Sequence, residues 1–321
     1  MRQAPEYEMC GGYMKKRTVM VLGAVGHVGP YIVDETLKLG HKVRALIWNA
    51  ERSANLPSEI DRVEGRLDDV SRLSLPLEGV DGLIVQVGMA KNIGNNPDTI
   101  DYRSLSNLLK ALEGRKVHVV IMTAANSFLN TNEIAPEAYF QMRISELMVR
   151  CSGLPYTIVR SGKALNGLTV NGFIKATPLS KIIDDPHALM LARKAAELAA
   201  EERRESGVKE EPEEETAEMD LEEHRRASLT ARQVGRVLAN SIFFEPAYGK
   251  AFEIYGVPGE QESKEDFFSK IPVENFDVAK ALARNDSQCA SQPPEIIDDI
   301  KEIKEMFEKG EEAFKKHIPH N

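Results

Sequence analysis

Apolar positions in the first half of the chain alternate between two periods. Short apolar runs, typical of strands buried on both faces, are separated by segments in which apolar residues recur every three or four positions, as in amphipathic helices. The predicted strands are Thr18–Leu22, Val43–Ile47, Arg62–Glu64, Gly82–Gln86, Val117–Thr123 and Tyr156–Arg160. The predicted helices between them are Pro30–Leu39, Val70–Leu75, Thr99–Leu112 and Pro136–Ser152. This alternation predicts an α/β fold with a doubly wound parallel sheet.

A turn with three glycines follows the first predicted strand. Residues 18–29 read TVMVLGAVGHVG, which places Gly23, Gly26 and Gly29 between a buried strand and a helix. Glycines let the backbone turn tightly and approach a pyrophosphate, and the start of the helix offers N–H groups to phosphates. This context predicts a dinucleotide site, in which Gly26 and Gly29 approach the pyrophosphate; the alternative is a glycine-rich turn without a ligand.

Beyond residue 162 the pattern is less regular. The predicted elements are a strand over Leu168–Ala176, helices over Leu189–Arg204 and Thr230–Phe244, a strand over Ala251–Tyr255 and a helix over Pro294–His317. An acidic insert over about 179–226 interrupts this part; we expect a solvated excursion, and the alternative is a lid or an arm for an oligomer or a protein partner. The expected parts are a tail over 1–16, a Rossmann-type dinucleotide-binding domain with the doubly wound sheet over 17–165, a smaller C-terminal lobe over 166–262, and a helical segment over 263–321.

Charge and cysteine content narrow the classes of function. Residues 193–226 carry 13 acidic and 7 basic side chains, most of the net charge of −9, and no basic stripe is present to bind nucleic acid. Cys10, Cys151 and Cys289 lie far apart, and neither they nor the histidines have metal-ligand spacing. No apolar run has the length of a membrane span. We therefore expect a cytoplasmic protein with a small-molecule substrate and without a metal.

Further segments carry a family resemblance. They read KVRALIWN over 42–49, EGRLDD over 64–69, GVDGLI over 79–84 and GLPYTIVRSG over 153–162. Together with the glycine turn, they resemble the atypical short-chain dehydrogenases/reductases, the NmrA-like and NAD(P)H-binding group. The resemblance covers about residues 17–256. It implies that residues 17–165 form an NAD(P)-binding domain and that the C-terminal lobe over 166–262 is a substrate lobe. That group contains quinone and flavin reductases, isoflavone-reductase-like enzymes, sugar-nucleotide epimerase relatives, and regulators that bind the cofactor without catalysis.

The resemblance implies a nicotinamide cofactor at the carboxyl ends of the strands. The residues expected to contact it are Gly23, Val25, Gly26, His27, Val28, Gly29, Trp48, Asn49, Arg52, Arg66, Leu67, Gln86, Val87, Gly88, Thr123, Arg143 and Arg160. Neither Trp48 nor Asn49 offers the carboxylate that binds the ribose diol of NAD, whereas Arg52 and Arg66 suit a 2′-phosphate. We therefore expect NADP(H) in preference to NAD(H). NAD(H) stays the alternative, because the Glu51 carboxylate could bind the ribose diol if its loop turns inward.

The resemblance also implies a catalytic tyrosine followed by a cation one helical turn later. Tyr139 and Arg143 match this i, i+4 spacing, with arginine in place of the usual lysine. Alanine stands at position 125, where the superfamily has a catalytic serine, and Thr123 and Ser127 are the nearest hydroxyls. The alternative is a solvated pair on a surface helix, in which Arg143 bridges to Glu146.

These observations favour an NAD(P)H-dependent oxidoreductase of the atypical short-chain dehydrogenase group. Its expected acceptor is a small carbonyl, a quinone or a flavin-like molecule. Because the catalytic pattern is altered, a non-catalytic NmrA-like regulator that senses NAD(P) is the second hypothesis. A sugar-nucleotide epimerase relative is the third.

Overall fold

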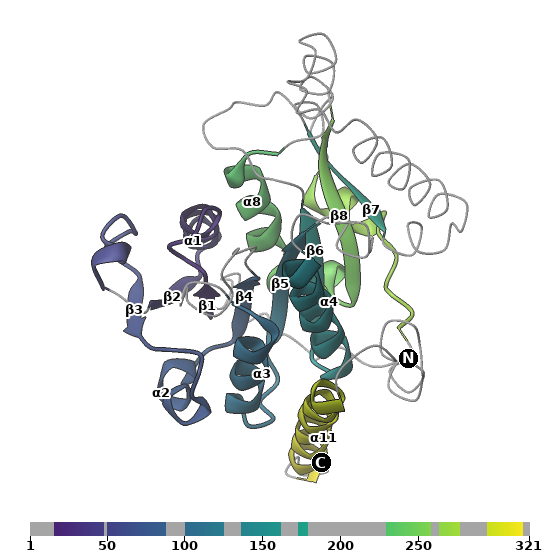
Figure 1. The fold of residues 1–321 in the computed structure, drawn as a ribbon. Helices are drawn as coiled ribbons and strands as arrows, with labels where there is room; N and C mark the ends of the chain where they lie inside the picture. The colour runs from purple at the N-terminus through teal and green to yellow at the C-terminus, as the bar shows by residue number, and fades with distance from the viewer. Residues whose placement is uncertain are drawn as a thin grey trace, which may run out of the picture.

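The sheet of the protein is known from a computed structural model that describes residues 16–47, 50–87, 100–124, 136–161, 173–178, 229–257, 263–276 and 294–316. Within these residues eight strands form one sheet in the order β3-β2-β1-β4-β5-β6-β8-β7 (Figure 1). The strands are β1 (Thr18–Leu22), β2 (Lys42–Ile47), β3 (Asp61–Glu64), β4 (Gly82–Gln86), β5 (His118–Ala124), β6 (Tyr156–Ser161), β7 (Phe173–Pro178) and β8 (Lys250–Val257). All are parallel except β7, which pairs antiparallel with β8.

Helices cover both faces of this sheet. They are α1 (Gly29–Lys38), α2 (Ser74–Leu77), α3 (Tyr102–Ala111), α4 (Pro136–Cys151), α8 (Ala231–Ser241), α9 (Lys264–Ser269) and α11 (Pro294–Lys316), with short 3₁₀ turns η1 (Ala50–Ser53), η2 (Val70–Arg72) and η3 (Glu245–Ala247). Successive strand residues point to opposite faces, so Met20 and Leu22 join the layer of α3, α4 and α11, while Val19 and Val21 join the layer of α1 and α8 (Figure 1). The predicted doubly wound α/β fold is confirmed.

The strand order reverses between β1 and β4. From β1 the chain moves outward to β2 and β3, and then returns to place β4 on the other side of β1. In the register of this pair Leu22 lies beside Val85, so the turn that starts at Gly23 lies next to Gln86. In open α/β sheets ligands bind at such a switch point, outside the carboxyl ends of the strands. The fold therefore places the glycine turn where a ligand is expected.

The segment after residue 228 belongs to the same sheet and not to a separate layer. β8 pairs with β6, and α8 packs directly on α1. The approach of the two helices is so close that a Cβ added at Gly235 would lie 2.9 Å from the carbonyl carbon of Tyr31. The domain boundaries at residues 165 and 262 stay predictions, although the sheet itself is continuous from β6 to β8.

The boundaries of several predicted elements change. The six strands of the first half are confirmed within one residue. The single helix predicted over Val70–Leu75 is wrong: η2 and the one-turn α2 stand there, and Asp69 caps η2 by accepting from the Ser71 N–H. The helix predicted from Thr99 begins at Tyr102, because Asp101 caps it by accepting from the Ser104 N–H.

In the second half, the helix predicted over Thr230–Phe244 ends at Ser241, shortly before Phe243 takes a positive φ of 56°. Helix α9, which begins behind its cap Ser263, was not predicted. The strand predicted over Leu168–Ala176 corresponds to β7. Residues 168–172, the helix predicted over Leu189–Arg204, the acidic insert and nearly all of the N-terminal tail lie outside the described residues.

Candidate functional site

The glycine turn owes its shape to backbone geometry that only glycine allows. Gly23 has a φ of +85°, and the Gly26 N–H donates to the Gly23 carbonyl oxygen at 2.9 Å. A Cβ added at Gly29 would lie 2.1 Å from the Gly23 oxygen and 2.4 Å from the Ala24 oxygen. Gly29 is thus needed for the packing of α1 against the turn. The main effect of a side chain at this position is a clash with the backbone of the turn, and not the expected clash with a pyrophosphate.

Gly26 differs from Gly29 in what surrounds it. A Cβ at Gly26 would lie 3.0 Å from the Gly23 oxygen and 3.5 Å from Gln86 Oε1, which small shifts can relieve. The Gln86 Oε1 atom is itself buried and has no hydrogen-bond partner among the described residues. A buried acceptor without a donor costs about 1–3 kcal/mol, so a bound molecule that donates to this atom would gain stability from the contact.

The first turn of α1 faces the same place. No side chain of the described residues caps it, and its N-cap residue is Val28. By contrast α3, α8 and α9 are each capped by a side chain, from Asp101, Thr230 and Ser263 respectively. An uncapped helix start beside a glycine turn is a suitable place for phosphate oxygens. A nicotinamide dinucleotide therefore fits the turn, α1 and Gln86.

The other residues expected near the turn differ in exposure. Val25 is partly buried and His27 is exposed, whereas the Val28 side chain lies in the apolar layer of α1, so only its backbone can face a ligand. Val87 is buried, donates its N–H to the Met122 oxygen at 3.1 Å and forms an isolated parallel bridge with Ile100. Their contacts with a cofactor stay predictions.

The residues expected around the adenosine half are only partly described. Arg66 forms an exposed pair with Asp68 at 2.7 Å, and the Leu67 carbonyl oxygen accepts from Asn107 Nδ2 at 2.8 Å. Trp48, Asn49 and Gly88 lie outside the described residues, as does the side chain of Arg52 in η1. The sequence-based choice of cofactor therefore rests, in the structure, on Arg66 alone.

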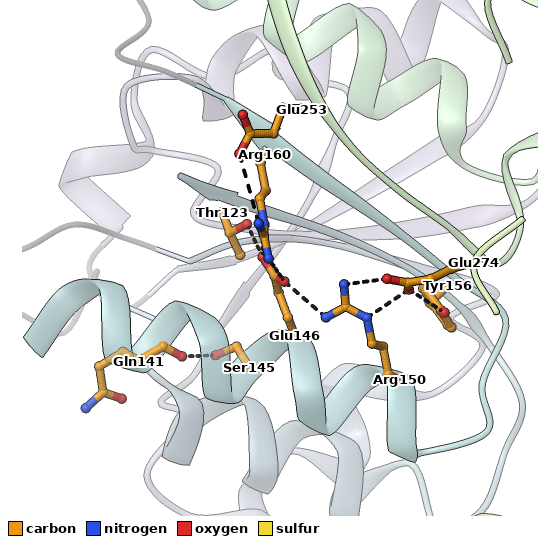
Figure 2. Close-up of polar contacts among 9 residues, drawn as sticks. All are labelled: Thr123, Gln141, Ser145, Glu146, Arg150, Tyr156, Arg160, Glu253 and Glu274. Carbon is orange, nitrogen blue, oxygen red and sulfur yellow. Dashed lines mark hydrogen bonds and ion pairs between the residues drawn. The ribbon is translucent and has the colours of Figure 1, made fainter. Parts of the chain in front are cut away.

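A buried carboxylate connects two further predicted residues. Glu146 of α4 accepts from the Thr123 hydroxyl at 2.7 Å and from Arg160 Nε and Nη2 at 2.8 and 2.7 Å (Figure 2). It also accepts from Arg150 Nη1 at 3.0 Å. Glu146 is 1% exposed. Burial alone would raise its pKa, but the two guanidinium groups and the hydroxyl outweigh burial and lower the pKa of Glu146 to about 2.

This arrangement assigns Thr123 and Arg160 an observed partner. Both were expected to contact the cofactor, and both direct their side chains to Glu146 of α4. They are 1% and 3% exposed. A contact with the cofactor stays a prediction for each, but the hydrogen bonds that the structure shows hold α4 against β5 and β6.

The predicted catalytic pair lies on the N-terminal half of α4. Tyr139 belongs to this helix, and its side chain lies outside the described residues. Arg143 is half-buried; burial and then the Arg160 cation lower the pKa of its guanidinium, and Glu146 opposes them. The alternative prediction is a solvated pair of Tyr139 and Arg143, with Arg143 bridging to Glu146 on the surface. It is wrong for Glu146, because that carboxylate is buried and bound by Arg150 and Arg160.

Sequence reasoning missed Glu146, Arg150 and the buried amide of Gln141, whose Oε1 accepts from the Tyr102 N–H at 3.3 Å. One signal was available: Arg160 stands in an otherwise buried strand, and a buried charge requires a partner of opposite sign. The partner itself could not be chosen from spacing. Among the described residues, no group of three His, Cys, Asp or Glu side chains could hold a metal, and no helix has the length and apolar character of a membrane span.

Relatives among curated proteins match part of the chain. It is 33% identical over 175 residues to the protein TIC 62, chloroplastic, of Pisum sativum, which covers 45% of this chain and 32% of that protein. It is 25% identical over 153 residues to the probable pinoresinol-lariciresinol reductase 3 of Arabidopsis thaliana, which covers 46% of this chain and 48% of that protein. The chain thus spans about a third of the first relative and about half of the second. A cytoplasmic location stays a prediction.

Solved structures share the fold at low identity. A putative NAD-dependent epimerase/dehydratase from Bacillus halodurans aligns with a TM-score of 0.53 and 20% identity, over 75% of this chain and 95% of that one. The oxidoreductase ylbE from Lactococcus lactis aligns with a TM-score of 0.54 and 14% identity, over 81% of this chain and all of that one. The family described as NAD(P)H-binding matches residues 23–182, which include the glycine turn, the switch point and α4. Residues 23–182 therefore form a domain of the NAD(P)H-binding family.

Proposed function

We propose that this protein binds a nicotinamide dinucleotide at the switch point and uses it to reduce a small carbonyl, quinone or flavin-like acceptor. The observation that carries the proposal is that two groups near the ends of β1 and β4 lack a side-chain hydrogen-bond partner among the described residues. The start of α1 lacks a side-chain cap, and the buried Gln86 Oε1 lacks a donor. Each suits a different part of a dinucleotide: the backbone N–H groups at the start of α1 would donate to pyrophosphate oxygens, and Gln86 Oε1, 3.5 Å from a Cβ built at Gly26, would accept from a hydroxyl of the cofactor.

The chain's own residues would bind and orient the reactants. The nicotinamide supplies the hydride when it is bound. Helix α4 runs antiparallel to the strands, so its N-terminal half, with Tyr139 and Arg143, lies at the carboxyl edge of the sheet. Tyr139 would donate the proton that a carbonyl acceptor requires, and the Arg143 cation would favour the ionised tyrosine and bind the nicotinamide ribose. One of the relatives described above is named as a reductase, which supports this direction of the reaction.

A preference for NADP(H) is part of the proposal. Arg66 lies just beyond the end of β3, and its side chain is 59% exposed in its pair with Asp68. Exposed pairs of this kind contribute only about 0–1 kcal/mol, so Arg66 can exchange Asp68 for a 2′-phosphate at little cost. A guanidinium matches phosphate geometry well.

One observation favours the second candidate, a non-catalytic regulator that senses NAD(P). Of the two hydroxyls nearest the missing serine, Ser127 lies outside the described residues, and the Thr123 hydroxyl is buried and donates to Glu146. In that position it cannot bind an acceptor. A quinone or flavin-like acceptor needs no such hydroxyl, whereas a carbonyl acceptor does. Partners through the acidic insert would belong to this second function.

Calorimetric titration with NADPH and NADH, followed by turnover with a panel of quinones, flavins and aldehydes, tests the proposal. Gly26→Ala should weaken dinucleotide binding by about tenfold or more, about 1.4 kcal/mol, because its methyl group occupies the space beside Gln86. Gly40→Ala is the control: it places a methyl group at a positive φ of 83°, in open space at the far end of α1. It should lower stability by about 1–2 kcal/mol and leave binding unchanged.

The outcomes separate the functions. Turnover of any acceptor that Gly26→Ala abolishes supports the oxidoreductase. Binding without turnover of any acceptor supports the regulator, and the cofactor should then still raise the melting temperature by linkage. Wild-type protein that binds neither dinucleotide, or a folded Gly26→Ala variant with unchanged affinity, contradicts the site.

A further inference from the structure

The buried charges on α4 form a line that the dinucleotide site does not explain. Glu146 binds Thr123, Arg160 and Arg150, and Arg150 donates in turn to both carboxylate oxygens of Glu274 at 2.8 and 2.9 Å (Figure 2). The Tyr156 hydroxyl donates to Glu274 as well, at 2.8 Å. Arg150 therefore connects two anchors of the same helix, one at Glu146 and one at Glu274.

The contacts of Glu146 lie at one position along β5 and β6. Thr123 and Arg160 are direct neighbours in the register of β5 and β6, and each is the residue before the last in its strand. Glu146 bridges the two, and the Ala124 N–H, at the last position of β5, lies 3.3 Å from Met142 Sδ on the same helix. These contacts fix how far α4 extends along the two strands.

Arg143 lies three residues before Glu146, toward the N-terminus of α4. Three residues of helix advance by about 4.5 Å, whereas one residue of strand advances by about 3.3 Å. Since Glu146 is level with Thr123 and Arg160, the backbone of Arg143 lies beyond the last residues of β5 and β6.

Stability alone is a weak reason for such an arrangement. A buried ion pair is often no more stable than well-packed apolar residues of the same size, because both charges lose their hydration. In some proteins buried ion pairs instead fix a single geometry, since a shift of the helix would separate a charge from its partner.

We propose that Glu146 is a positioning residue: it holds α4 against β5 and β6 so that Arg143 reaches the edge where the dinucleotide binds. The inference rests on the proposed function for the role of Arg143. Glu274 contacts neither Thr123 nor Arg160 in the hydrogen bonds described above. In this proposal it holds only the C-terminal end of α4.

Glu146→Gln and Glu274→Gln are a matched pair for testing this. Each replaces one carboxylate that binds Arg150, and both variants should lower the melting temperature. Only Glu146→Gln should raise the NADPH dissociation constant, by about tenfold, while Glu274→Gln should change it less than about twofold. With an acceptor that is turned over, Glu146→Gln should lower kcat and leave the KM of the acceptor nearly unchanged. Equal effects of the two variants on affinity and kcat would overturn the inference.

A double-mutant cycle shows whether Glu146 acts through Arg143. In an Arg143→Ala background, Glu146→Gln should have almost no further effect on the NADPH dissociation constant, because the group that it positions is gone. Full additivity of the two losses would contradict a positioning role. If Glu146→Gln does not fold, Thr123→Val takes its place: it keeps the ion pairs and removes one hydrogen bond to Glu146. It should then raise the dissociation constant about threefold, and an unchanged constant counts against the inference.

Hydrogen exchange separates this inference from the proposed function. Even without any dinucleotide, Glu146→Gln should raise exchange rates in residues 136–147 more than tenfold, and Glu274→Gln should not, because only Glu146 fixes that half of α4. If the wild-type protein binds no dinucleotide, the proposed function is wrong. The hydrogen-exchange rates then still test whether Glu146 positions α4. Equal exchange in both variants refutes it.

Discussion

Gly29→Ala should destabilise the protein strongly, and for a reason internal to the glycine turn. The new Cβ would lie 2.1 Å from the Gly23 oxygen and 2.4 Å from the Ala24 oxygen, and both atoms belong to the backbone. Neither can rotate away, so the start of α1 must move by about 1 Å. Overpacking of this kind costs about 1–3 kcal/mol, and two backbone contacts place Gly29→Ala near the upper end.

An opposing term is too small to rescue the variant. Alanine in place of glycine favours a helix by up to about 1 kcal/mol, and Gly29 is the first residue of α1. A net loss of about 2 kcal/mol corresponds to a melting temperature lower by about 4–8 °C in a domain of this size. Thermal and urea unfolding of the protein without cofactor measure this loss directly.

Gly26→Ala is the comparison within the same turn. Its Cβ approaches backbone no closer than 3.0 Å, so its unfolding midpoint should lie close to that of the wild type. The reasoning is refuted if Gly29→Ala melts with the wild type, or if Gly26→Ala loses as much stability as Gly29→Ala. In either case the short distances at Gly29 would not describe the packing of α1.

Two further predictions concern pH and cofactor choice. Burial, with Arg17 as a lesser cause, lowers the pKa of His118 to about 3, so the unfolded chain takes up a proton near pH 6.5 that the folded chain refuses. The stability that neutral His118 contributes is complete above pH 6.5 and falls toward pH 3 by up to about 1.4 kcal/mol per pH unit. The urea midpoint of the His118→Gln variant should therefore fall less than that of the wild type between pH 7 and pH 4. Equal pH slopes of the two midpoints would contradict this. Arg66→Ala should raise the NADPH dissociation constant about tenfold or more and spare NADH, since a charge-assisted bond contributes about 1.5–3 kcal/mol, whereas Arg72→Ala, from the exposed pair with Asp69, should change neither constant.

The amino-acid sequence by itself determined the fold and predicted where a ligand binds. Runs such as Thr18–Leu22 form strands because both faces of a parallel sheet are covered, and the period of the apolar residues does not depend on distant partners. Gly23 and Gly29 marked the turn because a positive φ at Gly23 and a close backbone approach at Gly29 require glycine locally. Ends of elements were less predictable where a side-chain cap competes with a helical pattern, as at Asp101.

Only the tertiary structure decided which charges meet. Arg160 and Glu146 are 14 residues apart, and Arg150 and Glu274 are 124 residues apart, so spacing along the chain cannot pair them. The unsatisfied Gln86 oxygen likewise follows from strand register and not from any motif. The period of the hydrophobic residues can be found within each element, because it depends only on which sides of that element are buried. The pairing of buried charges depends instead on which elements the fold brings together, and desolvation then requires that each charge find its partner there.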